Sequence, residues 1–108
     1  MGMIDTPVKT KNEIFSIIKK NQTQIKKFGI KRLGIFGSFV RNDNKKNSDI
    51  DILVEFEENQ KSFDNFMDTS YLLDDLFGKK VELVTAESLS PYIQPYIMKE
   101  IEYVTFTN

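Results

Sequence analysis

Apolar residues recur along the first part of the chain at spacings that predict a helix followed by a short strand. Within residues 10–28, four isoleucines lie at helical intervals, with lysines between them: Ile14, Ile17, Ile18 and Ile25. Gly29 follows this pattern, and glycine commonly ends a helix. Residues 30–36 (IKRLGIF) then form a short apolar run that stops at Gly37, which predicts a strand.

Two further segments predict strands of the same sheet. Residues 49–57 (DIDILVEFE) alternate acidic and aliphatic positions at first and then become almost continuously apolar. This pattern is typical of a central strand whose first turn reaches the surface. Residues 80–85 (KVELVT) predict a third strand with one acid, Glu82. The intervening residues 41–48 (RNDNKKNS) are polar and rich in asparagine, which predicts a loop.

Helical patterns occupy residues 62–77, before Gly78, and a segment that begins at Ser90. An aromatic stripe that we predict to lie in the core follows the first of them: Phe63, Phe66 and Phe77. In the second, Ser90 is the predicted N-cap and Pro91 the first helical residue. One face of that helix is predicted to carry three isoleucines: Ile93, Ile97 and Ile101. Residues 103–106 predict a short final strand.

The order of these elements predicts a layered α+β fold. We expect a small mixed sheet of three to four strands flanked by helices. The chain has 108 residues, which predicts a single domain over residues 1–108. Its apolar fraction of 40% and charged fraction of 29% are ordinary for a folded domain and argue against disorder.

The composition excludes several kinds of chemistry, because the chain has no histidine and no cysteine. A disulfide framework, a thiolate nucleophile and a cysteine-bound zinc or iron–sulfur cluster are excluded. An imidazole base and a Ser-His-Asp triad are excluded as well. Catalysis would therefore use carboxylates, cations, hydroxyls and the backbone. A bound metal should be a hard ion that prefers oxygen ligands, Mg²⁺ or alternatively Mn²⁺.

Charge is distributed unevenly along the chain. Residues 1–48 hold 11 Lys and Arg against 3 Asp and Glu, which gives +8, whereas residues 49–108 hold 4 against 13, which gives −9. One interpretation is two solvated faces that attract each other weakly. Another is a basic wall beside an acidic metal site, which suits a polyphosphate ligand. The net charge of −1 and the absence of a DNA-binding motif make direct nucleic-acid binding unexpected.

Nothing in the sequence predicts an association with a membrane. No apolar stretch approaches the roughly 18–20 residues that span a bilayer. The N-terminal residues lack the apolar core and cleavage site of a secretory signal. We expect a cytoplasmic protein without a membrane partner.

Three features that can carry chemistry converge in the predicted sheet. If the first two strands are antiparallel neighbours, Gly37 and Ser38 at the end of one lie beside Asp49 and Asp51 at the start of the other. The second and third strands are joined through a helix, which predicts parallel pairing by a right-handed crossover. This pairing brings Glu82 to the same edge of the sheet.

The residue types at this edge suit a metal and a triphosphate. Asp49 and Asp51 project to one face of a strand, roughly 6–7 Å apart at a rise of ~3.3 Å per residue, and can bridge one or two Mg²⁺ ions. Gly37 allows close approach of the backbone to phosphate, and Ser38 offers a hydroxyl and an N–H. Arg41 can add a charge-assisted phosphate contact. Glu82 can share the metal or take a proton from an attacking hydroxyl.

Each of these signals has a plainer interpretation when taken alone. Asp-x-Asp at the end of a strand is more often a solvated polar face, and Gly-Ser is often only a turn. Arg41 is equally well explained as an exposed loop cation, and Glu82 as an acid that protects a sheet edge. Together, Gly-Ser followed after ten residues by Asp-x-Asp should arise by chance in about one chain of this length per thousand.

At these positions the chain resembles a known family. Residues 37–41 (GSFVR) and 48–54 (SDIDILV) resemble the signature of the minimal nucleotidyltransferases of the DNA polymerase β superfamily. Residues 80–85 (KVELVT) and 89–92 (LSPY) resemble the end of that family's domain. The resemblance implies a small mixed sheet flanked by helices, Mg²⁺ and ATP as ligands, and transfer of a nucleoside monophosphate to a hydroxyl.

The resemblance also implies roles for single residues and a partner. Gly37 and Ser38 would hold the triphosphate, and Asp49 and Asp51 the metal. Glu82 stands where the family usually has a third aspartate, and its longer side chain can ligate metal or act as a base. Many members are antitoxins paired with a HEPN-domain ribonuclease toxin, and some silence the toxin by adenylylating one of its tyrosines. A hetero-oligomer with such a toxin is therefore expected.

Three functional hypotheses remain open at the level of sequence. The first is an Mg²⁺-dependent antitoxin that transfers AMP from ATP to a tyrosine hydroxyl of its HEPN toxin, and the short chain favours such a macromolecular acceptor. The second is a catalytically weak antitoxin that neutralises the toxin by binding alone. The third is nucleotidyl transfer to a small molecule, with a partner subunit completing the acceptor pocket.

Overall fold

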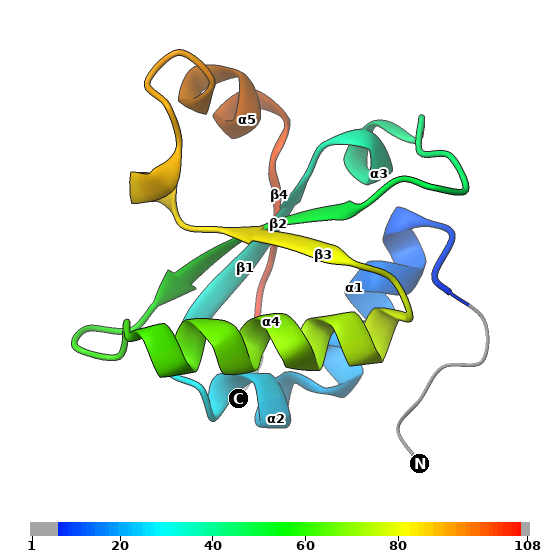
Figure 1. Ribbon diagram of the computed structural model, residues 1–108. Helices are drawn as coiled ribbons and strands as arrows, with labels where there is room; N and C mark the ends of the chain where they lie inside the picture. Colours follow the sequence, from blue (N-terminus) through cyan, green and yellow to red (C-terminus); the bar gives the residue numbers. More distant parts are fainter. Residues whose placement is uncertain (1–6, 107–108) are drawn as a thin grey trace.

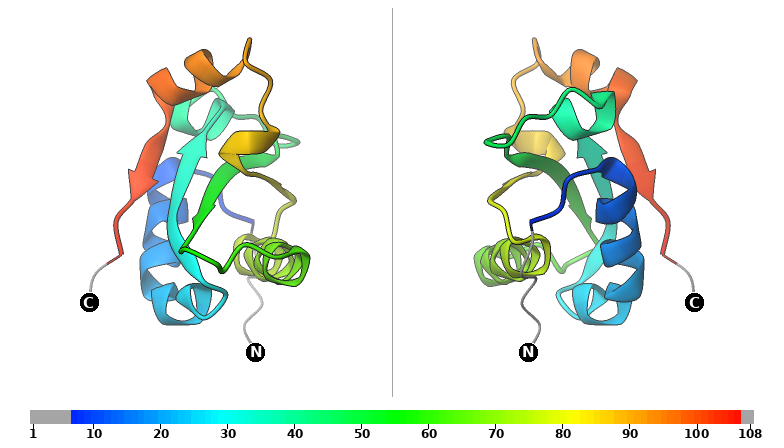
Figure 2. Two further views of the ribbon diagram at one scale, coloured as in Figure 1. Left: turned by 90° about the vertical axis from the view of Figure 1, so that its left-hand side faces the viewer. Right: turned by 90° about the vertical axis from the view of Figure 1, so that its right-hand side faces the viewer.

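The computed structural model describes residues 7–106 and contains a four-stranded mixed sheet in the order β3-β2-β1-β4 (Figure 1). The strands are β1 (Ile30–Phe36), β2 (Ile50–Phe56), β3 (Val81–Val84) and β4 (Glu102–Val104). β1 pairs antiparallel with both β2 and β4, and β2 pairs parallel with β3. Figure 2 shows β4 at one edge of this sheet. The predicted α+β class and mixed sheet are confirmed.

The larger hydrophobic core lies on one face of the sheet. That face is covered by α1 (Lys11–Lys20), α2 (Gln22–Lys26) and α4 (Phe63–Phe77), and α4 lies below the strands in Figure 1. Residues of β2 alternate between the two faces, as in any strand. Ile50 and Ile52 therefore enter this core and are fully buried.

The opposite face of the sheet carries a smaller apolar cluster. It is covered by α5 (Gln94–Glu100), which lies above the strands in Figure 1, and by the single turn η1 (Ala86–Ser88). Three buried residues form the middle of the cluster: Phe36, Leu53 and Ile97. Because Asp51 and Leu53 are two positions apart on β2, Asp51 faces the same side of the sheet as α5.

The prediction of one continuous helix over residues 10–28 is wrong, because the structure has two helices divided at Asn21. Thr10 caps the first part through a capping box with Glu13. At Asn21 the backbone leaves helical values (φ −111°, ψ 17°), and the side-chain Nδ2 donates to the carbonyl of Ile17 at 2.8 Å. An asparagine side chain that bonds the preceding turn in this way competes with the regular helical ladder.

The prediction for the last helix is wrong at its start. The helix begins at Gln94 rather than at Pro91, and its first turn contains Pro95. Ser90 instead closes a turn, since its Oγ accepts from the Tyr92 N–H and its carbonyl from two N–H groups further on. As a result, Ile93 precedes the helix and is 52% exposed. Of the three isoleucines predicted on one helical face, Ile97 alone is both helical and buried.

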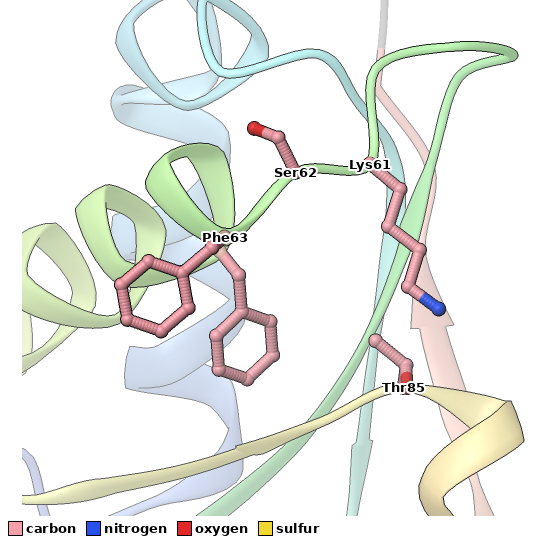
Figure 3. A pocket seen from close by; sticks show the side chains of 5 residues that line it. Lys61, Ser62, Phe63 and Thr85 are labelled. Atoms are coloured by element: carbon pink, nitrogen blue, oxygen red, sulfur yellow. The ribbon is translucent and has the colours of Figure 1, made fainter.

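Phe63 was predicted to lie in the core, and this is wrong. Its side chain is 77% exposed, whereas Phe77 is fully buried and Phe66 is partly buried against the core. Phe63 is the first residue of α4 and directly follows the cap residue Ser62, whereas Phe66, one turn later, packs against the core. With Lys61, Ser62 and Thr85 it lines a surface cavity of about 350 Å³ (Figure 3).

Within residues 7–106, no helix has both the length and the apolar content needed to cross a membrane.

Candidate active site

The turn after β1 has a conformation that requires glycine. Gly37 has φ +81° and ψ −154°, which side chains of L-residues rarely permit. A Cβ at Gly37 would also collide with the carboxylate of Asp51. The short helix α3 (Ser38–Arg41) follows directly. Gly37 therefore allows the backbone to press against Asp51 and places Ser38 at the same edge of the sheet.

The strand register brings together the residues that the sequence singled out. Phe36, the last residue of β1, is the antiparallel partner of Asp51, and Asp51 is the parallel partner of Glu82. Asp49 lies two residues before Asp51, is exposed and directly precedes β2. The predicted strand pairings are thus confirmed, and Gly37, the two aspartates and Glu82 meet at one edge. Their roles in binding and catalysis stay predictions.

The electrostatic environment of Asp51 is strongly unfavourable to its negative charge. Partial burial is the largest cause, followed by repulsion from Glu82 and Asp49, and together they raise the pKa of Asp51 to about 6. The positive charge of Arg41 acts in the opposite direction. Asp51 thus interacts electrostatically with the other two carboxylates.

The donor chemistry at this edge fits a hard divalent cation. Asp49, Asp51 and Glu82 offer only oxygen ligands, and their mutual repulsion would be relieved by a positive ion. Within the described chain, however, no three acidic residues already form a complete metal-binding group.

Ser38 is the first residue of α3 and is half-buried. Among residues 7–106, no protein group forms a hydrogen bond with its hydroxyl. The hydroxyl is therefore available to an incoming ligand at the position that the sequence predicted for phosphate.

Arg41 is held by two carboxylates, one of which the sequence did not indicate. Its Nη1 lies 2.9 Å from Glu100 Oε1 and its Nε lies 3.2 Å from Asp43 Oδ2. The hydrogen bond to Glu100, and then that to Asp43, raises the pKa of Arg41 above its ordinary value. Arg41 is thus ion-paired while its side chain stays 50% exposed, and its role toward phosphate stays a prediction.

Glu100 is the site residue that the sequence did not reveal. Its other oxygen, Oε2, accepts a hydrogen bond from the Gly37 N–H at 2.7 Å. One signal was present in the sequence: Glu100 ends a helix, where the dipole disfavours an acid and favours a cation. An acid in that position suggests a partner elsewhere, but the partner is 59 residues away in the sequence.

Comparison with known proteins identifies the family of this chain. The model of the family described as nucleotidyltransferase domain matches residues 13–104. The chain belongs to the nucleotidyltransferase domain family. Among its relatives is the protein adenylyltransferase MntA of Thermococcus cleftensis, 38% identical over 96 residues, which are 88% of this chain and 96% of that one.

Solved structures share the fold of this nucleotidyltransferase domain. A candidate minimal nucleotidyltransferase superposes with a TM-score of 0.74 at 23% identity, over 87% of this chain and 95% of that one. The MNT antitoxin complex with a tri-AMPylated HEPN toxin from Shewanella oneidensis gives a TM-score of 0.59 at 16% identity, over 86% and 73% of the two chains. At these identities the structures establish the fold alone.

Proposed function

We propose that this protein is an antitoxin that transfers AMP from ATP to a tyrosine hydroxyl of a HEPN-domain toxin in an Mg²⁺-dependent reaction. The observation that carries the proposal is the convergence of the Gly37 turn, Asp51 and Glu82 at one sheet edge, fixed by two strand registers. The name of the Thermococcus cleftensis relative supports the activity. The AMPylated toxin in the Shewanella oneidensis complex supports the acceptor.

In this proposal each residue of the site has a defined task. Asp49 and Asp51 hold the metal, with Glu82 as a third ligand or as the base. Ser38 donates its hydroxyl to a phosphate oxygen, and Gly37 permits the close approach of the backbone. Arg41 adds positive charge beside the triphosphate. The metal, when bound, neutralises charge that develops on the phosphates.

The reaction is a displacement at the α-phosphorus of ATP. The tyrosine oxygen forms the new bond to phosphorus, the bond to the β,γ-phosphates breaks, and pyrophosphate leaves with the electron pair. Glu82, which is exposed at the site, accepts the proton of the attacking hydroxyl. Asp49 is exposed as well, so a side chain presented by a large partner can reach the site.

A labelling experiment tests this proposal. The purified protein and its toxin are incubated with ATP labelled on the α-phosphate or on the γ-phosphate, with Mg²⁺, with Mn²⁺ or with EDTA. We expect label on the toxin only from α-labelled ATP and only with a divalent metal. Asp51→Asn should abolish labelling, whereas Asp68→Asn, an exposed position on α4, should leave it unchanged. Labelling from the γ-phosphate would show phosphoryl transfer instead and would contradict the proposal.

A second candidate function is neutralisation by binding alone. It is favoured by one observation, the absence of a complete acidic metal group among the described residues. Under this alternative, a variant with both Asp49→Asn and Asp51→Asn would still relieve the growth arrest caused by the toxin. Under the catalytic proposal the same variant fails to relieve it, although it still binds the toxin.

A further inference from the structure

Glu100, the last residue of α5, contacts the proposed nucleotide site although it lies far from it in the sequence. Its carboxylate bridges two groups, since Oε2 accepts from the Gly37 N–H at 2.7 Å and Oε1 lies 2.9 Å from Arg41 Nη1. The side chain of Glu100 is 24% exposed, and that of Arg41 is 50% exposed. The same carboxylate thus contacts both the phosphate-binding turn and the cation assigned to the triphosphate.

We propose that Glu100 is a positioning residue for the nucleotide. It fixes the Gly37 turn, and with it Ser38, and it keeps Arg41 away from the metal-binding aspartates. This inference rests on the proposed function, because it assigns Glu100 to the triphosphate part of the same site.

The turn is held between two carboxylates. Asp51 packs against the Cα of Gly37, and Glu100 accepts the Gly37 N–H. Gly37 is buried, so its N–H needs a protein acceptor. Since Ser38 is the next residue, a shift of the Gly37 peptide would move the Ser38 hydroxyl and N–H directly.

Without Glu100, Arg41 would have competing acceptors close by. The Glu100 carboxylate that holds Arg41 also accepts the Gly37 N–H, and Gly37 lies against the Asp51 carboxylate, so Arg41 and Asp51 both lie at this turn. The remaining partner, Asp43, is exposed and is bound through Nε alone. A released guanidinium would therefore pair with Asp51 and neighbouring carboxylates, which are the groups that the metal needs.

The fold places Glu100 rigidly enough for this task. On one side, α5 is anchored by Ile97, which is buried against the sheet. On the other side, the chain continues at once into β4, which pairs with β1. Ile101 between them packs so closely on Gly34 of β1 that a Cβ at Gly34 would collide with it. Glu100 is therefore fixed from both directions.

The test compares Glu100→Gln and Glu100→Ala with a matched control. Glu102→Gln removes a similar exposed ion pair, Lys11–Glu102 at 3.0 Å, which lies outside the site. The first measurement is binding of a non-hydrolysable ATP analogue with Mg²⁺ to the purified protein. The second is kcat and KM for ATP in AMP transfer to the toxin. The third is the NMR shift of the Gly37 amide proton.

We expect Glu100→Ala to weaken analogue binding and to raise KM for ATP by about tenfold or more, as for the loss of one charged hydrogen bond. Glu100→Gln keeps an acceptor for Gly37 and should recover part of the loss together with the wild-type Gly37 amide shift. In an Arg41→Ala background, Glu100→Gln should have little further effect. Glu102→Gln should match the wild type.

Unchanged analogue binding in both Glu100 variants would overturn the inference, because Glu100 would then have no effect on the nucleotide. Tighter binding would overturn it as well, because Glu100 would then compete with the triphosphate. If Glu100→Ala fails to fold, the isosteric Glu100→Gln still decides between these results. A wild type that binds the analogue but transfers no AMP would refute the proposed function, and analogue binding would then decide the role of Glu100. A wild type that binds no analogue would overturn both.

Discussion

Replacing Asp51 with asparagine should stabilise the folded domain while it removes the proposed metal ligand. The pKa of Asp51 is raised from 3.8 to about 6, mainly by burial and then by repulsion from Glu82 and Asp49. The folded protein thus binds the Asp51 proton more tightly than the unfolded chain does. The stability from this group is complete below about pH 4 and is lost as the pH rises through about 6.

The magnitude follows from the size of the pKa shift. A shift of about two units corresponds to about 3 kcal/mol of unfolding free energy at neutral pH. Asp51 is only half-buried, and solvent screening reduces the expected gain in Asp51→Asn to about 1–2 kcal/mol. A loss of activity would therefore accompany a gain in stability.

Urea unfolding in EDTA at pH 7 and at pH 4.5 measures this effect. We expect Asp51→Asn to exceed the wild type by about 1–2 kcal/mol at pH 7 and to lose most of that advantage at pH 4.5, where wild-type Asp51 is protonated. The exposed control Asp68→Asn should change the unfolding free energy by less than about 0.5 kcal/mol at both pH values. An Asp51→Asn variant that is no more stable than the wild type at pH 7 would refute the reasoning.

Three further substitutions test separate parts of the account. Gly37→Ala forces a Cβ into Asp51 at a positive φ, so urea unfolding should show a loss of about 1–3 kcal/mol, and an unchanged midpoint would contradict the described turn. Ser38→Ala should leave thermal stability unchanged and raise KM for ATP by about tenfold in the labelling assay; equal KM values would remove Ser38 from the site. Leu53→Ala removes a fully buried side chain from the cluster under α5 and should lower the unfolding free energy in urea by about 2–5 kcal/mol. An unchanged unfolding free energy would contradict the close packing of this cluster.

The regular parts of the fold were predictable because they depend on local patterns. The strand over residues 30–36 and the helix that ends at Gly78 follow directly from apolar spacing and glycine positions. The break at Asn21 was not predictable, because the apolar pattern continues across it, whereas the backbone leaves helical values at that residue and its side chain bonds the Ile17 carbonyl. Likewise, Ser90 and Pro91 suit a helix start, but here they form a turn, and the helix begins three residues after Pro91.

The candidate site was predictable as far as strand pairing determines it. Two registers suffice to bring Gly37, Asp51 and Glu82 to one edge. Glu100 was not predictable, since its contacts depend on how α5 returns across the sheet. The exposed position of Phe63 has a similar cause, because helical spacing does not show where the helix ends relative to the sheet beneath it.

The intact mass of the toxin after co-expression tests the central claim most directly. With the wild-type protein, we predict that the toxin mass increases by one or more AMP units, and that peptide mapping places each unit on a tyrosine. With the combined Asp49→Asn and Asp51→Asn variant, the toxin mass should stay unmodified although the complex still forms. An unmodified toxin in the wild-type complex, fully neutralised nonetheless, would contradict the catalytic account.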